Sequence, residues 1–163
     1  MSDEPASPVC YAADGDDAYM GYAARDEIVA ALNELLEAER AGARVALASA
    51  RTAEDARQGA LMTMIRADEA RWCAMLSRQL RRLDATPSRR TGAFHGKAMA
   101  IVRPLERLAF LNRGQAWVVR KLEALLPRVR DETLHRDLKA MLHSHRANIA
   151  EAEDLLAASG YAP

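Results

Sequence analysis

The sequence predicts an all-α protein: an up-down four-helix bundle with a long middle loop and an irregular N-terminal arm. Three observations lead to this prediction. Ala, Leu, Glu and Arg, which favour helices, are abundant in the 163-residue chain. Apolar residues recur at helical spacing over four long stretches, and Pro, Gly and polar residues separate those stretches. We expect one domain over residues 25–160, preceded by the arm over residues 1–24.

The four helices are expected, in order, at residues 26–50, 52–83, 97–126 and 132–158. Asp26 and Thr52 are the expected N-caps of the first two helices. The polar interval 87–96 predicts the middle loop, and Pro104 is expected to bend the third helix or to delay its start. Gly160 is expected to end the fourth helix. Each helix would be about 40 Å long, and four helices of matched length are typical of a bundle.

Composition and charge exclude several classes of protein. The chain has 23 Lys and Arg against 23 Asp and Glu, so it lacks the basic surface expected of a general nucleic-acid or membrane-surface binder. No apolar run reaches the length that spans a bilayer, and the acidic N-terminus does not resemble a signal peptide. Two cysteines do not make a disulfide framework. We therefore expect a cytoplasmic protein that binds neither nucleic acid nor membranes.

A polar layer is expected across the middle of the bundle. The core-facing stripe of every helix is apolar at both ends and polar in the middle, so the four helices place polar residues at about the same depth. Buried carboxylates are costly, so Glu39 and Glu69 need a cation, a shared proton, or amide and imidazole donors. The layer is therefore either a hydrogen-bond network that sets helix register or a metal or small-molecule site. Its members are Glu39, Glu69, Asn112, Gln115, His145 and Asn148.

Two segments of the sequence carry a family resemblance. The run Leu32–Glu39 reads L-N-E-L-L-E-A-E, and Leu83 and Pro87 follow Glu69. The run resembles the first-helix motif L-N-x-L-L-x-x-E of ferritin-like proteins of the bacterioferritin and rubrerythrin type, whose last Glu is a di-iron ligand. The offsets after Glu69 are similar to those after the ligand Glu of their second helix. The resemblance implies a ferritin-like bundle over most of residues 26–158.

The sequence also departs from the di-iron ligand set of that family. Trp72 stands at the histidine position of the second-helix motif, and an indole N–H cannot ligate iron. Gln115 or Asn112 replaces the third-helix Glu, and the fourth-helix motif reads His145-x-x-Asn148 instead of Glu-x-x-His. Two carboxylates balance one divalent ion, so the resemblance implies a degenerate site for one transition metal, Fe or Mn in preference to Zn. The ligands would be Glu39, Glu69 and His145, with Gln115 and Asn148 as weaker ligands or outer partners.

Three functions remain open from the sequence. The leading hypothesis is a metal-binding protein, with oxidoreductase chemistry on an unidentified small substrate if the protein is an enzyme. The second is a metal-free, non-catalytic bundle that dimerises or binds a partner. The third is a small-molecule pocket in the same cavity, because Gly42, Ala43 and Ala46 leave space above Glu39. We expect the chain to form a homodimer.

Overall fold

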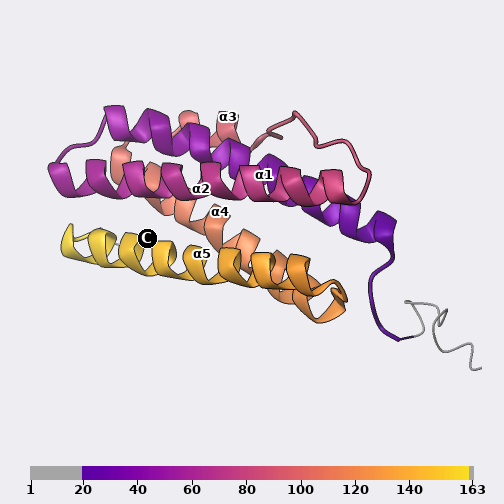
Figure 1. Ribbon diagram of the computed structural model, residues 1–163. Coiled ribbons are helices and arrows are strands. Elements are labelled where there is room, and N and C mark those ends of the chain that lie inside the picture. Colours follow the sequence, from indigo (N-terminus) through magenta and orange to yellow (C-terminus); the bar gives the residue numbers. More distant parts are fainter. Residues whose placement is uncertain (1–19, 162–163) are drawn as a thin grey trace, which may run out of the picture.

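The computed structural model describes residues 20–161, and this part of the chain is all-helical, with no β-strand. Four long helices pack side by side, and a short helix lies in the connection between the second and third of them (Figure 1). The expected arm falls mostly on residues 1–19, which lie outside the described residues. The elements are α1 (Arg25–Arg51), α2 (Ala56–Arg82), α3 (Phe94–Met99), α4 (Pro104–Leu125), the 3-10 turn η2 (Leu126–Arg128) and α5 (Glu132–Ala158).

Two apolar clusters make up the core, one on each side of the polar layer. The first cluster contains Leu35, Leu76 and Leu138, and the second contains Val45 and Ile65. All five side chains are buried, and burying a residue of this kind stabilises the fold by about 1.5–3 kcal/mol. The predicted pattern of apolar ends and a polar middle is thus present in the packed helices.

Helix ends differ from the sequence prediction at three places. Asp26 is not the N-cap of the first helix; it lies in the first turn of α1, and Ala24 is the N-cap. Thr52 is not the N-cap of the second helix; it ends α1, and the Asp55 carboxylate caps α2 by accepting a hydrogen bond from the Gln58 backbone N–H at 2.8 Å. The third expected helix is divided into α3 and α4. Pro104 explains the division, because proline has no N–H to continue a helix but is well tolerated in its first turn, where α4 begins.

The connection between α2 and α4, residues 83–103, crosses the bundle from one end to the other. Near its start the Ser88 backbone N–H donates to Asn33 Oδ1, early in α1, at 2.7 Å. Just beyond its end the Arg107 guanidinium donates to Thr52 Oγ1, at the end of α1, at 3.4 Å. Hence α2 and α4 run in the same direction, and the strict up-down order that we expected is wrong at this step.

The other helix pairs follow from this crossover. The start of α5 lies beside the end of α2, where the Gln79 side-chain amide donates to Asp137 Oδ2 at 2.7 Å. Helix α1 packs against α2 and α4, and α5 packs against the same two helices from the opposite corner. Neighbouring helices are therefore antiparallel, and the crossover lies along α1. None of the described helices combines the length and apolar character that a membrane crossing requires.

Candidate functional site

A pocket of about 460 Å³ opens between α1, α4 and the segment 91–94 of the crossover. Its volume lies in the range of small-molecule sites, about 300–1,000 Å³. Four buried polar side chains, one from each long helix, meet at its floor: Glu39, Glu69, Gln115 and His145. None of the four is more than 2 % exposed. The sequence predicted polar residues at one depth on all four helices, and the structure brings these four of them together.

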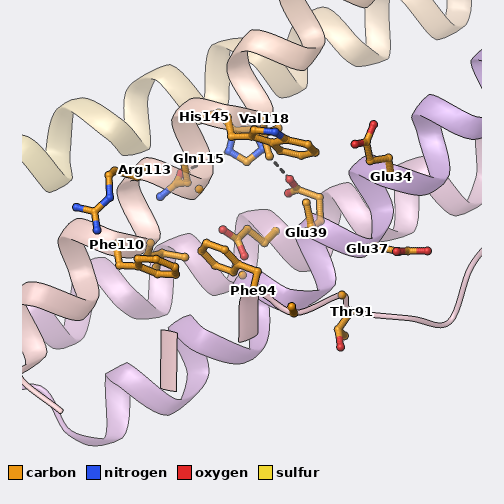
Figure 2. Close-up of a pocket in the computed structure, with 18 of the residues that line it drawn as sticks. Glu34, Glu37, Glu39, Thr91, Phe94, Phe110, Arg113, Gln115, Val118 and His145 are labelled. Carbon is orange, nitrogen blue, oxygen red and sulfur yellow. Dashed lines mark hydrogen bonds and ion pairs between the residues drawn. The ribbon is translucent and has the colours of Figure 1, made fainter. Parts of the chain in front are cut away.

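His145 is held between two other floor residues. Its Nε2 lies 3.0 Å from Glu39 Oε1, and its Nδ1 lies 3.4 Å from Gln115 Oε1 (Figure 2). With the Gln115 oxygen facing the ring, Nδ1 carries a proton and donates to it. The contact of Nε2 with Glu39 Oε1 is the second hydrogen bond of the ring.

Three polar atoms at the floor have no hydrogen-bond partner within the described residues. They are Glu39 Oε2, Glu69 Oε2 and Gln115 Nε2. A buried polar atom without a partner costs about 1–3 kcal/mol, and most such atoms in folded proteins are satisfied. All three residues line the pocket, while the three atoms themselves are closed to solvent. A ligand seated there supplies the missing partners when these side chains turn toward it.

Burial changes the acidity of two groups in this layer. The pKa of Glu69 is raised well above its ordinary value, first by desolvation and then by the negative charges of Glu39 and Asp68. Desolvation, together with the charge of Glu39, also raises the pKa of the Cys73 thiol to about 12. Glu69 therefore favours its neutral form, and the Cys73 thiol stays protonated and is a poor nucleophile at neutral pH.

Two helix glycines make room for the parts of the pocket. A Cβ atom at Gly42 of α1 would collide with the Glu69 carboxyl group. At Gly114 of α4, a Cβ atom would lie 2.6 Å from Cζ of Phe94. Glycine inside a helix lowers its stability by about 1 kcal/mol relative to alanine. At both positions the missing side chain allows close packing around the pocket.

The apolar wall of the pocket includes the two phenylalanines of the chain. Phe94 comes from the crossover and Phe110 from α4, and their rings stack with centroids 4.9 Å apart and planes 19° from parallel. Figure 2 shows the stacked pair below Gln115 and His145 in that view. Helical periodicity did not predict this wall; the signal in the sequence that points to it is Gly114, a glycine in the middle of a helix.

The crossover is fastened to α1 beside the pocket. Glu37 Oε1 accepts hydrogen bonds from Ser88 Oγ at 2.5 Å and from Arg90 Nε at 3.1 Å. The Ser88 hydrogen bond is the main cause of the lowered pKa of Glu37. Arg40 Nη1 donates to the Arg90 carbonyl oxygen at 2.7 Å. These contacts hold the chain that leads to Phe94 along the rim.

Asn148 and Asn112 do not join the floor. Asn148 Nδ2 donates to Asp68 Oδ2 at 3.2 Å, and Asn148 is not part of the pocket lining. Asn112 lines a second hollow, of about 400 Å³, between α4 and α5. Trp72 packs in the apolar core instead of on the pocket. Of the five expected ligands, Asn148 is thus the one that the structure places elsewhere.

The geometry of the floor bears on metal binding. Among the residues that the structure describes, no three His, Cys, Asp or Glu side chains are placed to hold a metal ion together. The donor types suit one divalent ion, and two carboxyl oxygens there are unpartnered. In this arrangement, however, His145 Nε2, the nitrogen that would ligate a metal ion, is hydrogen-bonded to Glu39.

The Glu69→Gln variant tests the buried acid. A raised pKa means that the folded protein keeps a proton that the unfolded chain releases, so wild-type stability falls as the pH rises above the ordinary Glu value and through the folded one. Glutamine does not titrate. As the pH rises through this window, the free energy of unfolding of the variant should therefore increase relative to that of the wild type, by up to about 1.4 kcal/mol per pH unit. Urea unfolding at about pH 5, 7 and 9 measures the difference; Glu151→Gln, an exposed carboxyl on α5, should show no trend.

The Gly114→Ala variant tests the seat of Phe94. The added methyl group should displace the Phe94 ring and cost about 1–3 kcal/mol, which outweighs the gain in helix propensity. Gly59→Ala is the matched control, because a Cβ there meets only Ala53 Cβ at 3.5 Å and should stabilise α2 by up to about 1 kcal/mol. Urea unfolding compares the two. Equal stabilisation by both substitutions would contradict the tight seat.

Comparison with known proteins gives one family. No curated protein matches the chain. The model of the family described as "Domain of unknown function (DUF6306)" matches residues 26–154, which spans α1, α2, α3, α4 and nearly all of α5. The pocket and its floor lie entirely within the matched region. The chain therefore belongs to the DUF6306 family.

Proposed function

We propose that this protein binds a small organic molecule in the pocket, with the polar group of the ligand on the floor and its apolar part against Phe94 and Phe110. One observation carries the proposal: three buried polar atoms lack partners beneath an open, partly aromatic pocket. Apolar contact with the wall supplies affinity. The floor supplies selectivity, because a ligand that leaves its polar atoms unmatched forfeits about 1–3 kcal/mol per atom.

We also infer that the bundle is of the ferritin-like type. The support is the single long crossover between α2 and α4, which is the connection of ferritin-like folds, together with polar residues from four helices at one level. The first-helix run that ends at Glu39 adds sequence support. Ferritin-like bundles build their sites in the core between facing helices, which is where the floor of this pocket lies.

The Ala38→Trp variant tests ligand binding. Ala38 lines the pocket on α1 and packs against the edge of the apolar core, so the indole should fill the space, and circular dichroism checks that the fold is kept. A fragment library screened by saturation-transfer NMR should contain members that bind the wild type and lose binding in Ala38→Trp. Ala30→Trp, on an exposed position of the same helix, should keep those members. Equal binding by all three proteins would place the fragments outside the pocket and contradict the proposal.

A single divalent metal ion is the second candidate for the same floor. The observation that favours it is the pair of unpartnered oxygens on two different carboxyl groups, Glu39 Oε2 and Glu69 Oε2. Glu39, Glu69 and His145 would be the ligands, and Gln115 would be a weaker one. Because the imidazole nitrogen is bonded to Glu39, we derive no reaction step through such an ion.

Elemental analysis separates the two candidates. If the floor is a metal site, protein purified without chelator or affinity tag should carry about one equivalent of Fe or Mn per chain. The Glu39→Ala/Glu69→Ala double variant should then carry none while keeping its helical circular dichroism. The organic-ligand proposal predicts no stoichiometric metal in either protein. Metal in the native protein that the double variant retains would place the ion elsewhere.

Three expectations from the sequence stay predictions: a homodimer, a cytoplasmic location, and the alternative of a non-catalytic partner-binding module. Sedimentation velocity at two protein concentrations measures the first. A partner-binding module would need no ligand at the floor of the pocket. In such a protein the floor residues would form only a structural hydrogen-bond network: Glu39, Glu69, Gln115 and His145.

A further inference from the structure

We propose that the ligand of the pocket is a small organic cation, a primary amine with an apolar aromatic or aliphatic group. Its ammonium group would contact the carboxyl oxygens of Glu39 and Glu69, and its apolar group would lie against Phe94 and Phe110. This inference rests on the proposed function, since it names the chemical class of the molecule that the pocket binds.

The unmatched atoms of the floor select the polar group of the ligand. Two of the three are carboxyl oxygens, Glu39 Oε2 and Glu69 Oε2, and the third is the amide nitrogen Gln115 Nε2. An ammonium group donates three hydrogen bonds and can reach oxygens of both carboxyl groups. A bound ammonium group favours the ionised forms of both carboxyl groups, because an opposite charge nearby stabilises a buried carboxylate. A carboxylate or phosphate at the same place would do the reverse, since it would place like charges together out of water.

The rim of the pocket carries basic side chains as well as acidic ones, and burial decides whether the rim or the floor sets the charge of the ligand. Arg113 and Arg120 also line the pocket, but both are exposed. The acidic rim residues Glu34 and Glu37 are paired with basic side chains. Exposed charges are screened by water and salt and contribute little. The desolvated carboxyl groups therefore set the preferred charge of the ligand, and the rim arginines do not reverse it.

The aromatic wall suits the rest of such a molecule. The stacked rings of Phe94 and Phe110 present flat apolar surface beside the floor, and Trp117 also lines the pocket. Aromatic faces attract a nearby cation as well as apolar groups. An amine with a ring or short hydrocarbon group can thus match the wall and the floor at once, which a hydrated inorganic ion does not do.

Three probes with one carbon skeleton test the inference on the full chain: phenethylamine, 2-phenylethanol and phenylacetate. Isothermal titration calorimetry should give the amine at least about tenfold higher affinity than the alcohol, because a charge-assisted hydrogen bond is stronger than a neutral one. Phenylacetate should bind most weakly. Glu69→Gln and Glu39→Gln should each lower amine affinity by about tenfold or more and leave the alcohol nearly unchanged. Glu151→Gln is the matched control and should alter none of the three.

The contrary outcomes distinguish this inference from the proposed function. Phenylacetate binding as tightly as phenethylamine, or an amine preference that persists in Glu69→Gln, overturns the cation class while the pocket remains a binding site. If none of the probes binds but Ala38→Trp blocks other fragments, the class is again wrong and the proposed function stands. If no fragment depends on Ala38, both are wrong. Circular dichroism of each variant confirms that a lost signal is not a lost fold.

Discussion

The burial of two carboxyl groups in the middle of the bundle is the constraint on which the structure depends. Glu39 and Glu69 are both nearly inaccessible to water, and each is accommodated in a different way. His145 forms a hydrogen bond with Glu39. Glu69 lies over Gly42, and burial favours its neutral form. The register of all four long helices must bring these groups together, because an unmatched buried charge costs more than the bundle gains from one extra apolar contact.

The crossover turns this polar layer into the floor of a pocket. A hairpin-like connection would leave α2 and α4 antiparallel and would carry no chain along α1. The observed connection spans the bundle, is tied to α1 through Glu37, and places Phe94 against Gly114 and Phe110. The polar layer thereby gains an aromatic wall on one side. Mid-helix glycines, which weaken isolated helices, are the local cost of this arrangement.

Both candidate ligands of the pocket would supply partners for buried polar atoms that lack them. Oxygens of Glu39 and Glu69 and the Gln115 amide nitrogen are buried without partners, and any occupant that supplies them stabilises the folded protein. A metal ion would draw on the carboxyl and imidazole groups. An ammonium group would use the two free oxygens and leave the Glu39–His145 hydrogen bond in place; the Gln115 amide nitrogen would need an acceptor elsewhere on the ligand. The organic cation also uses the aromatic wall, which a metal ion would leave without a role.

The sequence by itself determined the helical class, the extents of α1 and α5, and the depth at which Glu39, Glu69, Gln115 and His145 meet, because helical periodicity is a local signal. Tertiary structure decided the rest. The direction of α4 depends on contacts between distant segments, such as that of Arg107 with Thr52. Asn148 bonds to Asp68 on another helix, and Phe94 reaches the pocket only because the crossover runs along α1. Periodicity shows which face of a helix is inward, but only packing decides which neighbour that face meets.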